Sequence, residues 1–308
     1  MMDKTYIEMV RLLLEIAPAI FESSHFAMKG GTAINLFVEN MPRFSVDIDV
    51  VYTNHQASRD EAMESIARGL DAARERLIRM DIEAELSSVK IGDEIKLFIR
   101  RGRHQVKVEV NHVFRGTVLP VKILQLGTEA RKLFTTELSV PILAVAELYG
   151  SKLVAAMDRQ HPRDLFDVRG LFERNGLTAE MVECFVCYLA GHNRPVHEVL
   201  FSHDQDIASA FENEFVGMSR DPVTLPELQQ VRRKLKYKLP ALLTPNQRQF
   251  LLGLVAGQPN WKLMQCPHLS QLPAIRWKLQ NLAKLKKSNP RKFTRQFEEL
   301  DARLAGQL

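Results

Sequence analysis

Asp47 and Asp49 are separated by a single residue in the segment SVDIDVVY, residues 45–52. The alternating pattern of this segment predicts a β-strand, and residues i and i+2 of a strand share a face. The two aspartates would therefore project together while Ile48 points into the core. Adjacent carboxylates repel each other unless cations lie between them. Because Mg²⁺ prefers oxygen ligands and often binds carboxylates together with substrate phosphates, the pair predicts a magnesium site.

A glycine turn, Gly30-Gly31-Thr32, precedes these aspartates and begins a helix pattern. Glycine allows the backbone to approach a ligand closely, and the N–H groups at a helix start attract phosphate. Thr32 would add a hydroxyl contact, and Lys29 either adds charge or only flanks the turn. The turn and the aspartates together predict a nucleoside triphosphate (NTP) held by backbone amides and metal ions.

Glu109 is the candidate for a third metal ligand. Alternation along its predicted strand places it on one face with Lys107 and Asn111. Each feature also has an ordinary structural interpretation. A Gly-Gly-Thr turn commonly starts a helix, a D-x-D pair commonly ends a strand at the surface, and a lone glutamate commonly faces solvent. Their order along the chain makes the combination more specific than any one of them.

A second group of charged residues follows later in the chain. Lys152 and Arg159 are seven residues apart, so two helical turns bring them to one face. A positive pair there would meet triphosphate oxygens and the charge that develops on the leaving pyrophosphate. Arg163 and Asp167 are four apart, and Asp164 is three from Asp167. These are also surface ion-pair spacings, worth ~0.5 kcal/mol each, so alone the segment indicates a salt-bridged helix.

The elements that must position these residues form an α+β first half. The patterns predict helices at residues 1–21 and 59–80 and a short strand before Gly30. Further predicted strands, joined by short polar turns such as 91–94, cover residues 45–52, 82–90, 94–101, 104–113 and 117–124. We therefore expect a mixed or antiparallel sheet with flanking helices.

The pattern becomes helical after residue 136. The segment PILAVAELYGSKLVAAMDR predicts a helix with Pro141 in its opening turn. The next helix follows residues 160–162 and ends at Asn175-Gly176. We place the boundary near residue 138, which gives an α/β core at 1–138 and a mainly helical domain at 139–308.

The composition is that of a soluble globular protein. The 308 residues are 45% hydrophobic and 26% charged. We expect no membrane span, because no apolar run approaches about 20 residues. Asp3, Glu8 and Glu15 interrupt the first segment, which favours an amphipathic helix over a signal peptide. Three cysteines in this length suggest a reducing compartment, so we expect a cytoplasmic protein.

Cys184 and Cys187 form a C-x-x-C pair, which raises the question of a metal. No second pair completes a four-thiolate site, and His192 and His197 match no zinc spacing. The surrounding apolar residues recur at helical spacing, so we interpret both cysteines as buried helix residues.

The positive charge is unevenly distributed. The net charge is +5, and residues 276–308 contain nine Lys or Arg against three Asp or Glu. A shorter cluster, RRKLKYK, occupies residues 232–238. Such clusters favour a polyanion partner, and the alternative is a solvated helix face.

Two blocks of the sequence resemble the AbiEii/AbiGii toxin family of DNA polymerase β-like nucleotidyltransferases. The first is GGTAINLF at residues 30–37 followed by RFSVDID at 43–49. The second is ELYGSKLVAAMDRQHPRDLFD at residues 147–167. Residues 260–282 are also similar to the family, so the resemblance spans nearly the whole chain.

The resemblance implies a toxin of a bacterial toxin–antitoxin or phage-defence system, with a cognate antitoxin as partner. It implies transfer of a nucleoside monophosphate (NMP) from an NTP, with tRNA as the acceptor in some members. Asp47, Asp49 and Glu109 would hold two Mg²⁺ ions that bridge the triphosphate and activate the attacking hydroxyl. Asp49 and Glu109 are both candidates for a general base.

The remaining site residues are expectations of the same kind. Lys152 would be catalytic, and Arg43 and Ser45 would support the aspartate strand. The expected nucleotide-binding set is Lys29, Gly30, Gly31, Thr32, Lys152, Arg159, Arg163 and Asp167. The basic C-terminal helices would hold an RNA by its phosphates.

Two other function classes fit parts of the pattern. One is a non-catalytic nucleotide- or RNA-binding regulator, against which Mg²⁺-dependent pyrophosphate release would argue. The other is a metal-dependent nuclease that uses the same carboxylates, and it predicts shortening of RNA without any NTP. The glycine turn favours the transferase.

Overall fold

The computed structural model describes residues 4–87, 95–174 and 176–306. The chain divides into two compact units. Unit 1 comprises Met1–Leu148 and Val216–Pro222, and unit 2 comprises Tyr149–Phe215 and Val223–Leu308.

Seven strands, counted over the described residues, form one mixed sheet in unit 1. The strands are β1 (Phe26–Lys29), β2 (Asp47–Tyr52), β3 (Glu83–Leu86), β4 (Ile95–Arg101), β5 (His104–Asn111), β6 (Lys122–Gln125) and β7 (Ser139–Ile142). Their order across the sheet is β3-β4-β5-β2-β1-β7-β6. β2 runs parallel to β5 and antiparallel to β1, and β7 runs parallel to β1. The expected α+β class and mixed sheet are confirmed.

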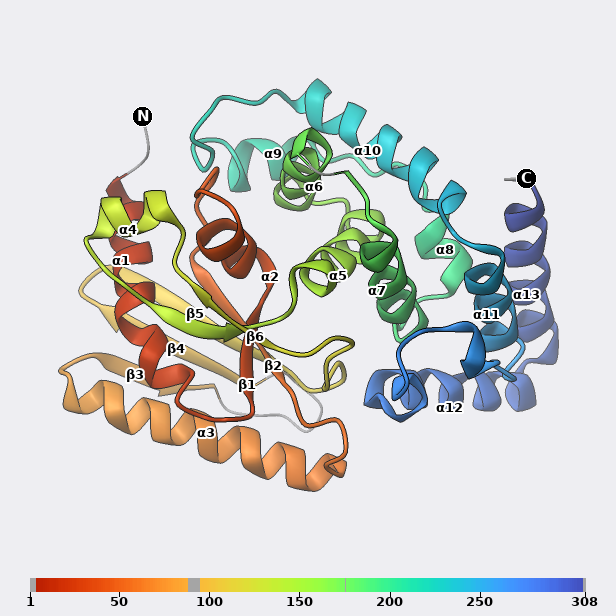
Figure 1. The fold of residues 1–308 in the computed structure, drawn as a ribbon, viewed down its shortest axis with the longest axis horizontal. Helices are drawn as coiled ribbons and strands as arrows, with labels where there is room; N and C mark the ends of the chain where they lie inside the picture. The colour runs from red at the N-terminus through yellow and green to blue at the C-terminus, as the bar shows by residue number, and fades with distance from the viewer. Residues whose placement is uncertain (1–3, 88–94, 175, 307–308) are drawn as a thin grey trace. The chain divides into compact units, whose positions relative to one another are not determined.

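The helices of unit 1 are α1 (Lys4–Ile20), α2 (Gly30–Thr32), η1 (Ala33–Val38), α3 (Arg59–Arg79) and α4 (Thr128–Phe134). α1 contacts β5, α3 contacts β3 and β4, and the two helices contact each other, so both lie on the same face of the sheet (Figure 1). Ser58 and Glu61 form a reciprocal capping box that fixes the start of α3. Ile66, Leu70 and Leu77 form part of its buried stripe.

The strand and helix expected near Pro141 differ from the prediction. Residues 139–142 form β7, with Pro141 opposite Ile123 of β6, and helix α5 begins only at Val145. A short apolar run fits a buried strand or a buried helix equally well, and only the neighbouring strands decide between them. The strand expected at 117–124 is shorter, because β6 begins at Lys122. The predicted turn at 91–94 lies outside the described residues.

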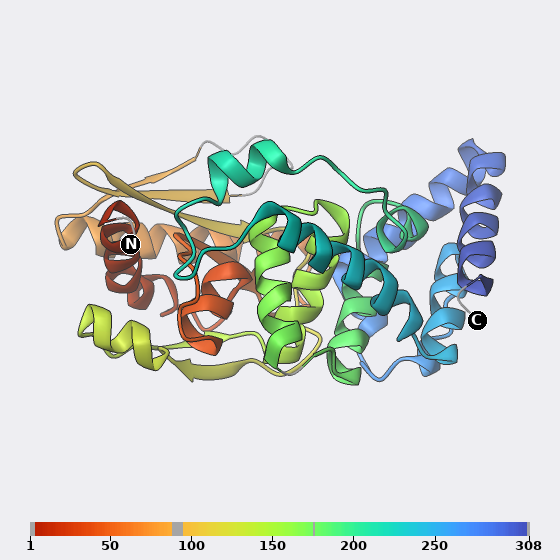
Figure 2. The same cartoon turned by 90° about the horizontal axis from the view of Figure 1, so that it is seen from above.

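Unit 2 consists of helices in the described ranges. After α5 (Val145–Asp158), which begins in unit 1, these are α6 (Pro162–Arg174), α7 (Ala179–Ala190), α8 (Val196–Leu200), α9 (Ala208–Glu214), α10 (Leu225–Ala241), α11 (Pro245–Val255), η2 (Trp261–Leu263), η3 (Leu269–Gln271), α12 (Pro273–Ser288) and α13 (Pro290–Ala305). Figure 2 shows α10 passing along α6, and the two helices are in contact. Cys184 and Cys187 are fully buried in α7, as expected.

The division of the chain differs from the expected boundary at residue 138. β7 follows that residue and belongs to the sheet, and unit 1 extends to Leu148. Residues 216–222 also belong to unit 1. There Phe44 N–H donates to the Met218 carbonyl at 2.8 Å, and Arg220 N–H donates to the Pro42 carbonyl at 2.8 Å. Nothing in the local pattern of residues 216–222 indicates these distant partners.

Within the ranges that the structure describes, no helix is both long and apolar enough to cross a membrane.

Candidate active site

The turn after β1 brings the chain against the strand that carries the aspartates. Gly30 has φ +76°, a conformation that favours glycine. A Cβ built on Gly30 would lie 2.0 Å from Asp49 Oδ2, so any side chain here would displace the carboxylate. Gly30 is therefore required for two reasons, its backbone conformation and its contact with Asp49.

The next two residues tie the turn to the segment that enters β2. A Cβ on Gly31 would lie 2.8 Å from Arg43 Nη2 and 3.1 Å from Ser45 Oγ. The Thr32 and Ser45 hydroxyls form a hydrogen bond of 2.9 Å, and the Thr32 hydroxyl also donates to the Asp47 carbonyl. These contacts hold the turn and the start of β2 together.

Asp47 and Asp49 lie on one face of β2. Both are half-buried, whereas Ile48 between them is fully buried. The helical turn α2 continues directly into the π-helical segment η1. π-Helical segments are rare in proteins, and many of those that occur lie at functional sites. β2 therefore presents two carboxylates on one face, and the backbone of Gly30 lies next to the carboxylate of Asp49.

Glu109 is adjacent to Asp49 across the parallel pairing of β2 and β5. Its carboxylate forms ion pairs with Lys96 Nζ at 2.8 Å and Lys107 Nζ at 3.1 Å. Burial opposes ionisation of Glu109, but the hydrogen bonds and charges of the two lysines outweigh burial and hold its pKa below the usual value. Glu109 is therefore ionised at neutral pH and is ion-paired with two lysines.

The donor set fits a hard divalent cation at Asp47 and Asp49. Both supply carboxylate oxygens from one strand face, and the Asp49 carboxylate lies directly against the backbone of Gly30. The three acids are not gathered into a ready ligand set, however. Among the described residues, no group of three or more His, Cys, Asp or Glu side chains is arranged to hold a metal ion. Glu109 lies on the expected strand, with its carboxylate directed to lysines.

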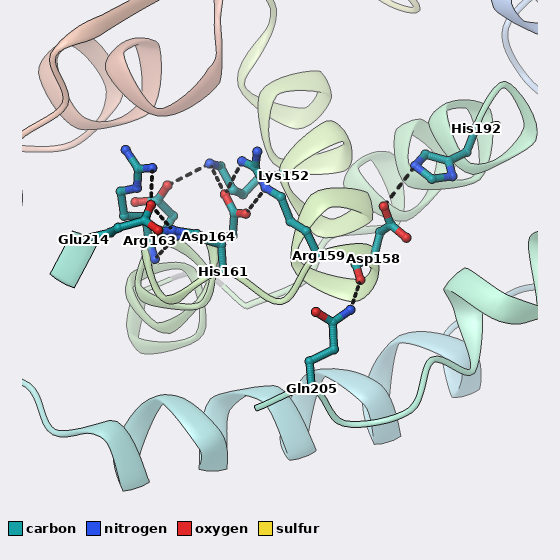
Figure 3. A network of polar contacts seen from close by, with 10 residues as sticks. Lys152, Asp158, Arg159, His161, Arg163, Asp164, His192, Gln205 and Glu214 are labelled. Carbon is teal, nitrogen blue, oxygen red and sulfur yellow. Dashed lines mark hydrogen bonds and ion pairs between the residues drawn. The ribbon is translucent and has the colours of Figure 1, made fainter. Parts of the chain in front are cut away.

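The second charged block forms a buried ion cluster in unit 2 (Figure 3). Lys152 Nζ lies 2.8 Å from Asp164 Oδ1 and 3.0 Å from Asp167 Oδ2. All three side chains are almost completely buried. Lys152 projects from α5 and both acids from α6, so the cluster joins two helices.

Arg159 extends this cluster to the surface. Its Nε and Nη2 lie 2.6 Å and 3.1 Å from the two oxygens of Asp164, while 64% of its side chain is exposed. Burial raises the pKa of Asp164, but the charges and hydrogen bonds of Lys152 and Arg159 outweigh it and hold that pKa far below the usual value. Lys152 and Arg159 come together, as their spacing predicts, and both form ion pairs with Asp164.

Arg163 belongs to a different contact in the same region. Its Nη2 lies 3.6 Å from Glu214 Oε2, and His161 Nε2 lies 3.1 Å from the same oxygen (Figure 3). Burial, the largest effect, lowers the pKa of His161. The imidazole Nδ1 accepts the Arg163 N–H at 3.1 Å and so helps to begin α6.

The family comparison decides the identity of the chain. The family described as "Nucleotidyl transferase AbiEii toxin, Type IV TA system" matches residues 11–281. The chain belongs to the AbiEii toxin family. It is therefore a nucleotidyltransferase of a type IV toxin–antitoxin family, for which an NTP substrate, a divalent metal and a partner antitoxin are implied.

A solved structure supports the fold of this AbiEii-family protein. MenT4, a nucleotidyltransferase toxin from Mycobacterium tuberculosis H37Rv, is 20% identical, with a TM-score of 0.58. The similarity covers 78% of this chain and 87% of that one. No curated protein matches the chain in sequence.

Sequence reasoning did not assign the lysine partners of Glu109 in this AbiEii-family site. Alternation places Lys107 on one face with Glu109, but the ion pair between the two side chains was not predicted. Lys96 lies opposite Glu109 on β4, and only the register of β4 and β5 reveals it. Glu147 was also missed. It is fully buried, and its carboxylate accepts the N–H groups of Val118 and Leu119 at 2.8 Å and 2.9 Å.

Proposed function

We propose that this AbiEii-family enzyme transfers an NMP from an NTP to an acceptor RNA, with tRNA as the first acceptor to test. The observation that supports the proposal most strongly is the contact between the glycine turn and Asp49, in which a Cβ on Gly30 would lie 2.0 Å from the carboxylate. That contact brings a candidate metal ligand next to the backbone that we propose to bind phosphate. A nuclease has no need of a triphosphate site next to its carboxylates.

Each residue of the turn has a distinct part in this proposal. The N–H groups of Gly30 and Gly31 bind phosphate oxygens. Thr32 acts as a positioning residue, because its hydroxyl is bonded to the Asp47 carbonyl and to Ser45. Arg43 is buried beside Gly31 and donates to the Phe44 carbonyl at 2.8 Å, so it too supports the site from behind.

Asp47 and Asp49 would hold the divalent cation, for which Mg²⁺ is the natural candidate. A bound cation supplies charge for the phosphate oxygens and lowers the pKa of an attacking hydroxyl. Glu109 would act as a third ligand only after exchanging its lysine partners. Lys96 and Lys107 would then be available to the triphosphate.

In the second block, Arg159 is the residue that we expect to meet a phosphate, since its guanidinium is the exposed cation of the cluster. Lys152, Asp164 and Asp167 would position it. Lys29, which precedes the glycine turn, and Arg163, which is next to Asp164, are further candidates for binding nucleotide.

The test is incorporation of labelled nucleotide by purified protein supplied with Mg²⁺, each NTP and total RNA. Asp47→Asn and Asp49→Asn should each reduce incorporation at least about a hundredfold, because the charge that holds the cation is lost. Asp71→Asn is the matched control, since Asp71 forms a partly exposed ion pair with Arg74 in α3. RNA that shortens without NTP would establish the nuclease instead. NTP binding without pyrophosphate release would establish the regulator.

The toxin role has a separate test in cells. Expression should arrest growth, and the product of a neighbouring antitoxin gene should relieve the arrest. Asp49→Asn should remove the arrest without any antitoxin. Arrest that persists in Asp49→Asn would contradict toxicity through nucleotidyl transfer.

A further inference from the structure

The outer face of α10 presents an aromatic ring among cations. Between residues 232 and 240, the exposed residues of α10 are Arg233, Lys234, Tyr237 and Lys238. Tyr237 is 77% exposed, the highest value among the large hydrophobic side chains that the structure describes. A ring this exposed contributes little to the stability of its own helix.

The basic cluster at residues 232–238 separates into two sets with different partners. Arg232 and Lys236 point to Asp204, with N–O distances of 3.3 Å and 2.6 Å, and Arg232 is buried. These two cations hold the loop before α9 and are structural. Lys234 and Lys238 lie on the other side of the helix with Tyr237.

A hollow of about 320 Å³ lies next to Tyr237, and it is formed within unit 2. Its apolar walls and its rim are made by Phe172, Gly176, Leu177, Lys234, Tyr237, Lys238, Ala241 and Leu242. None of these described lining residues carries a carboxylate. Among the described lining residues, an anion would meet two lysines and a cation would meet no carboxylate.

The lysines are positioned over this hollow. Lys234 Nζ lies 4.6 Å from the centroid of the Phe172 ring, so a cation–π contact holds its ammonium group above the wall. Lys238 is one helical turn further along the same face, and Tyr237 lies between them. Flat apolar surface flanked by cations at this spacing matches a nucleobase with its flanking phosphates.

We propose that this hollow is a binding site for unpaired nucleotides of the acceptor RNA, with one base stacked on Tyr237 and phosphates on Lys234 and Lys238. This inference rests on the proposed function, since it assigns the contact for the acceptor. An apolar protein helix is a poorer occupant, because it would leave two lysines on the rim without acids. An acidic antitoxin segment is the competing occupant and is distinguished by the experiment.

The experiment measures binding of full-length protein to a fluorescent single-stranded RNA and to tRNA, without NTP, and in a second assay to the product of the neighbouring antitoxin gene. Tyr237→Ala should weaken binding about tenfold, and Tyr237→Phe should bind like the parent, because the ring is kept. Lys234→Gln and Lys238→Gln should each reduce the slope of log K against log salt by about 0.7. The control is Ile123→Ala, since Ile123 is 68% exposed and lies on β6 in unit 1, outside both basic segments.

The outcomes separate this inference from the proposed function. Unchanged RNA binding by Tyr237→Ala overturns the inference, as does an equal loss in Ile123→Ala. Loss of antitoxin binding with unchanged RNA binding also overturns it and assigns the hollow to the antitoxin. Asp49→Asn should bind RNA like the parent and transfer nothing. If the parent binds RNA through Tyr237 but never incorporates nucleotide, the proposed function fails and the binding site stands.

Discussion

At the scale of single residues, the site depends on glycine at position 30 as much as on Asp47 and Asp49. Gly30 and Asp49 occupy adjoining space, and the positive φ of Gly30 directs the backbone toward the carboxylate. The charge of Glu109 is balanced by Lys96 and Lys107 on the same sheet face. The region therefore contains cations as well as acids before any metal is considered.

Gly30→Ala should abolish nucleotidyl transfer and destabilise the protein by more than the strain of its backbone alone. Gly102→Ala is the matched control, because Gly102 also has a positive φ, +58°, but a Cβ there would meet nothing within 4 Å. We expect the control to cost about 1 kcal/mol and to keep full activity. Thermal unfolding and nucleotide incorporation of both variants measure the difference. Equal effects in the two variants would mean that the Asp49 contact is unimportant.

At the scale of elements, a buried ion cluster holds α5 against α6. Lys152 is the shared partner of Asp164 and Asp167, so its removal leaves two buried acids without this cation. Removing one partner of a buried ion pair lowers the free energy of unfolding by more than the intact pair adds to it. The remaining charge is then buried away from water without its partner.

Lys152→Met should lower the free energy of unfolding by about 3–5 kcal/mol. Arg295→Met should change it by no more than about 0.5 kcal/mol, because the Arg295–Glu299 pair is an exposed pair four residues apart on one helix. Urea unfolding at pH 7 measures both. A Lys152→Met variant as stable as the parent would show that the acids find other partners.

The same cluster makes stability depend on pH in acid. The pKa of Asp164 is lower in the folded state than its unfolded value of about 3.9, so the folded state binds fewer protons. The stabilisation is fully present above about pH 4 and is lost as the pH falls toward the folded pKa. Asp164→Asn should be less stable than the parent at pH 7 and should lose less stability between about pH 4 and pH 2. Chemical unfolding across this range measures the slope, and parallel slopes would contradict it.

At the scale of the whole molecule, the chain leaves unit 1 after Leu148 and returns to it for residues 216–222. The returning segment bonds to Pro42 and Phe44, and Arg220 also donates to the Asn40 carbonyl at 3.0 Å. These residues lie immediately before Ser45 and β2. A distant segment thus fixes the approach to the candidate metal ligands.

A fragment of residues 1–148 should be less stable than the same fragment with residues 216–222 attached through a flexible linker. The difference should be about 2–3 kcal/mol, because two backbone hydrogen bonds and the Arg220 contact are restored. The fragment with the linker alone is the control, and thermal unfolding is the measurement. If the segment gives no gain over the linker alone, unit 1 does not require it.

The positions of Asp47, Asp49 and the glycine turn were predictable because they rest on local periodicity. Alternation put both aspartates on one face and Ile48 in the core, and β2 has that burial. The capping residues Ser58 and Glu61 are likewise local, and α3 begins where the sequence predicts. The family resemblance was also predictable from the sequence, because it depends on motifs and their spacing along the chain. The family match over residues 11–281 confirms it.

Tertiary structure decided the features that depend on distant partners. β7 is a strand because β1 and β6 flank it, although its apolar run also suited a helix. Glu109 is bonded to Lys96 through the register of β4 and β5, and Lys152 to two acids through the packing of α5 on α6. Local sequence determines which face a side chain takes, because that depends only on the period of its own backbone. Which group it meets there depends on the element that packs against it, and that is settled only when the chain folds.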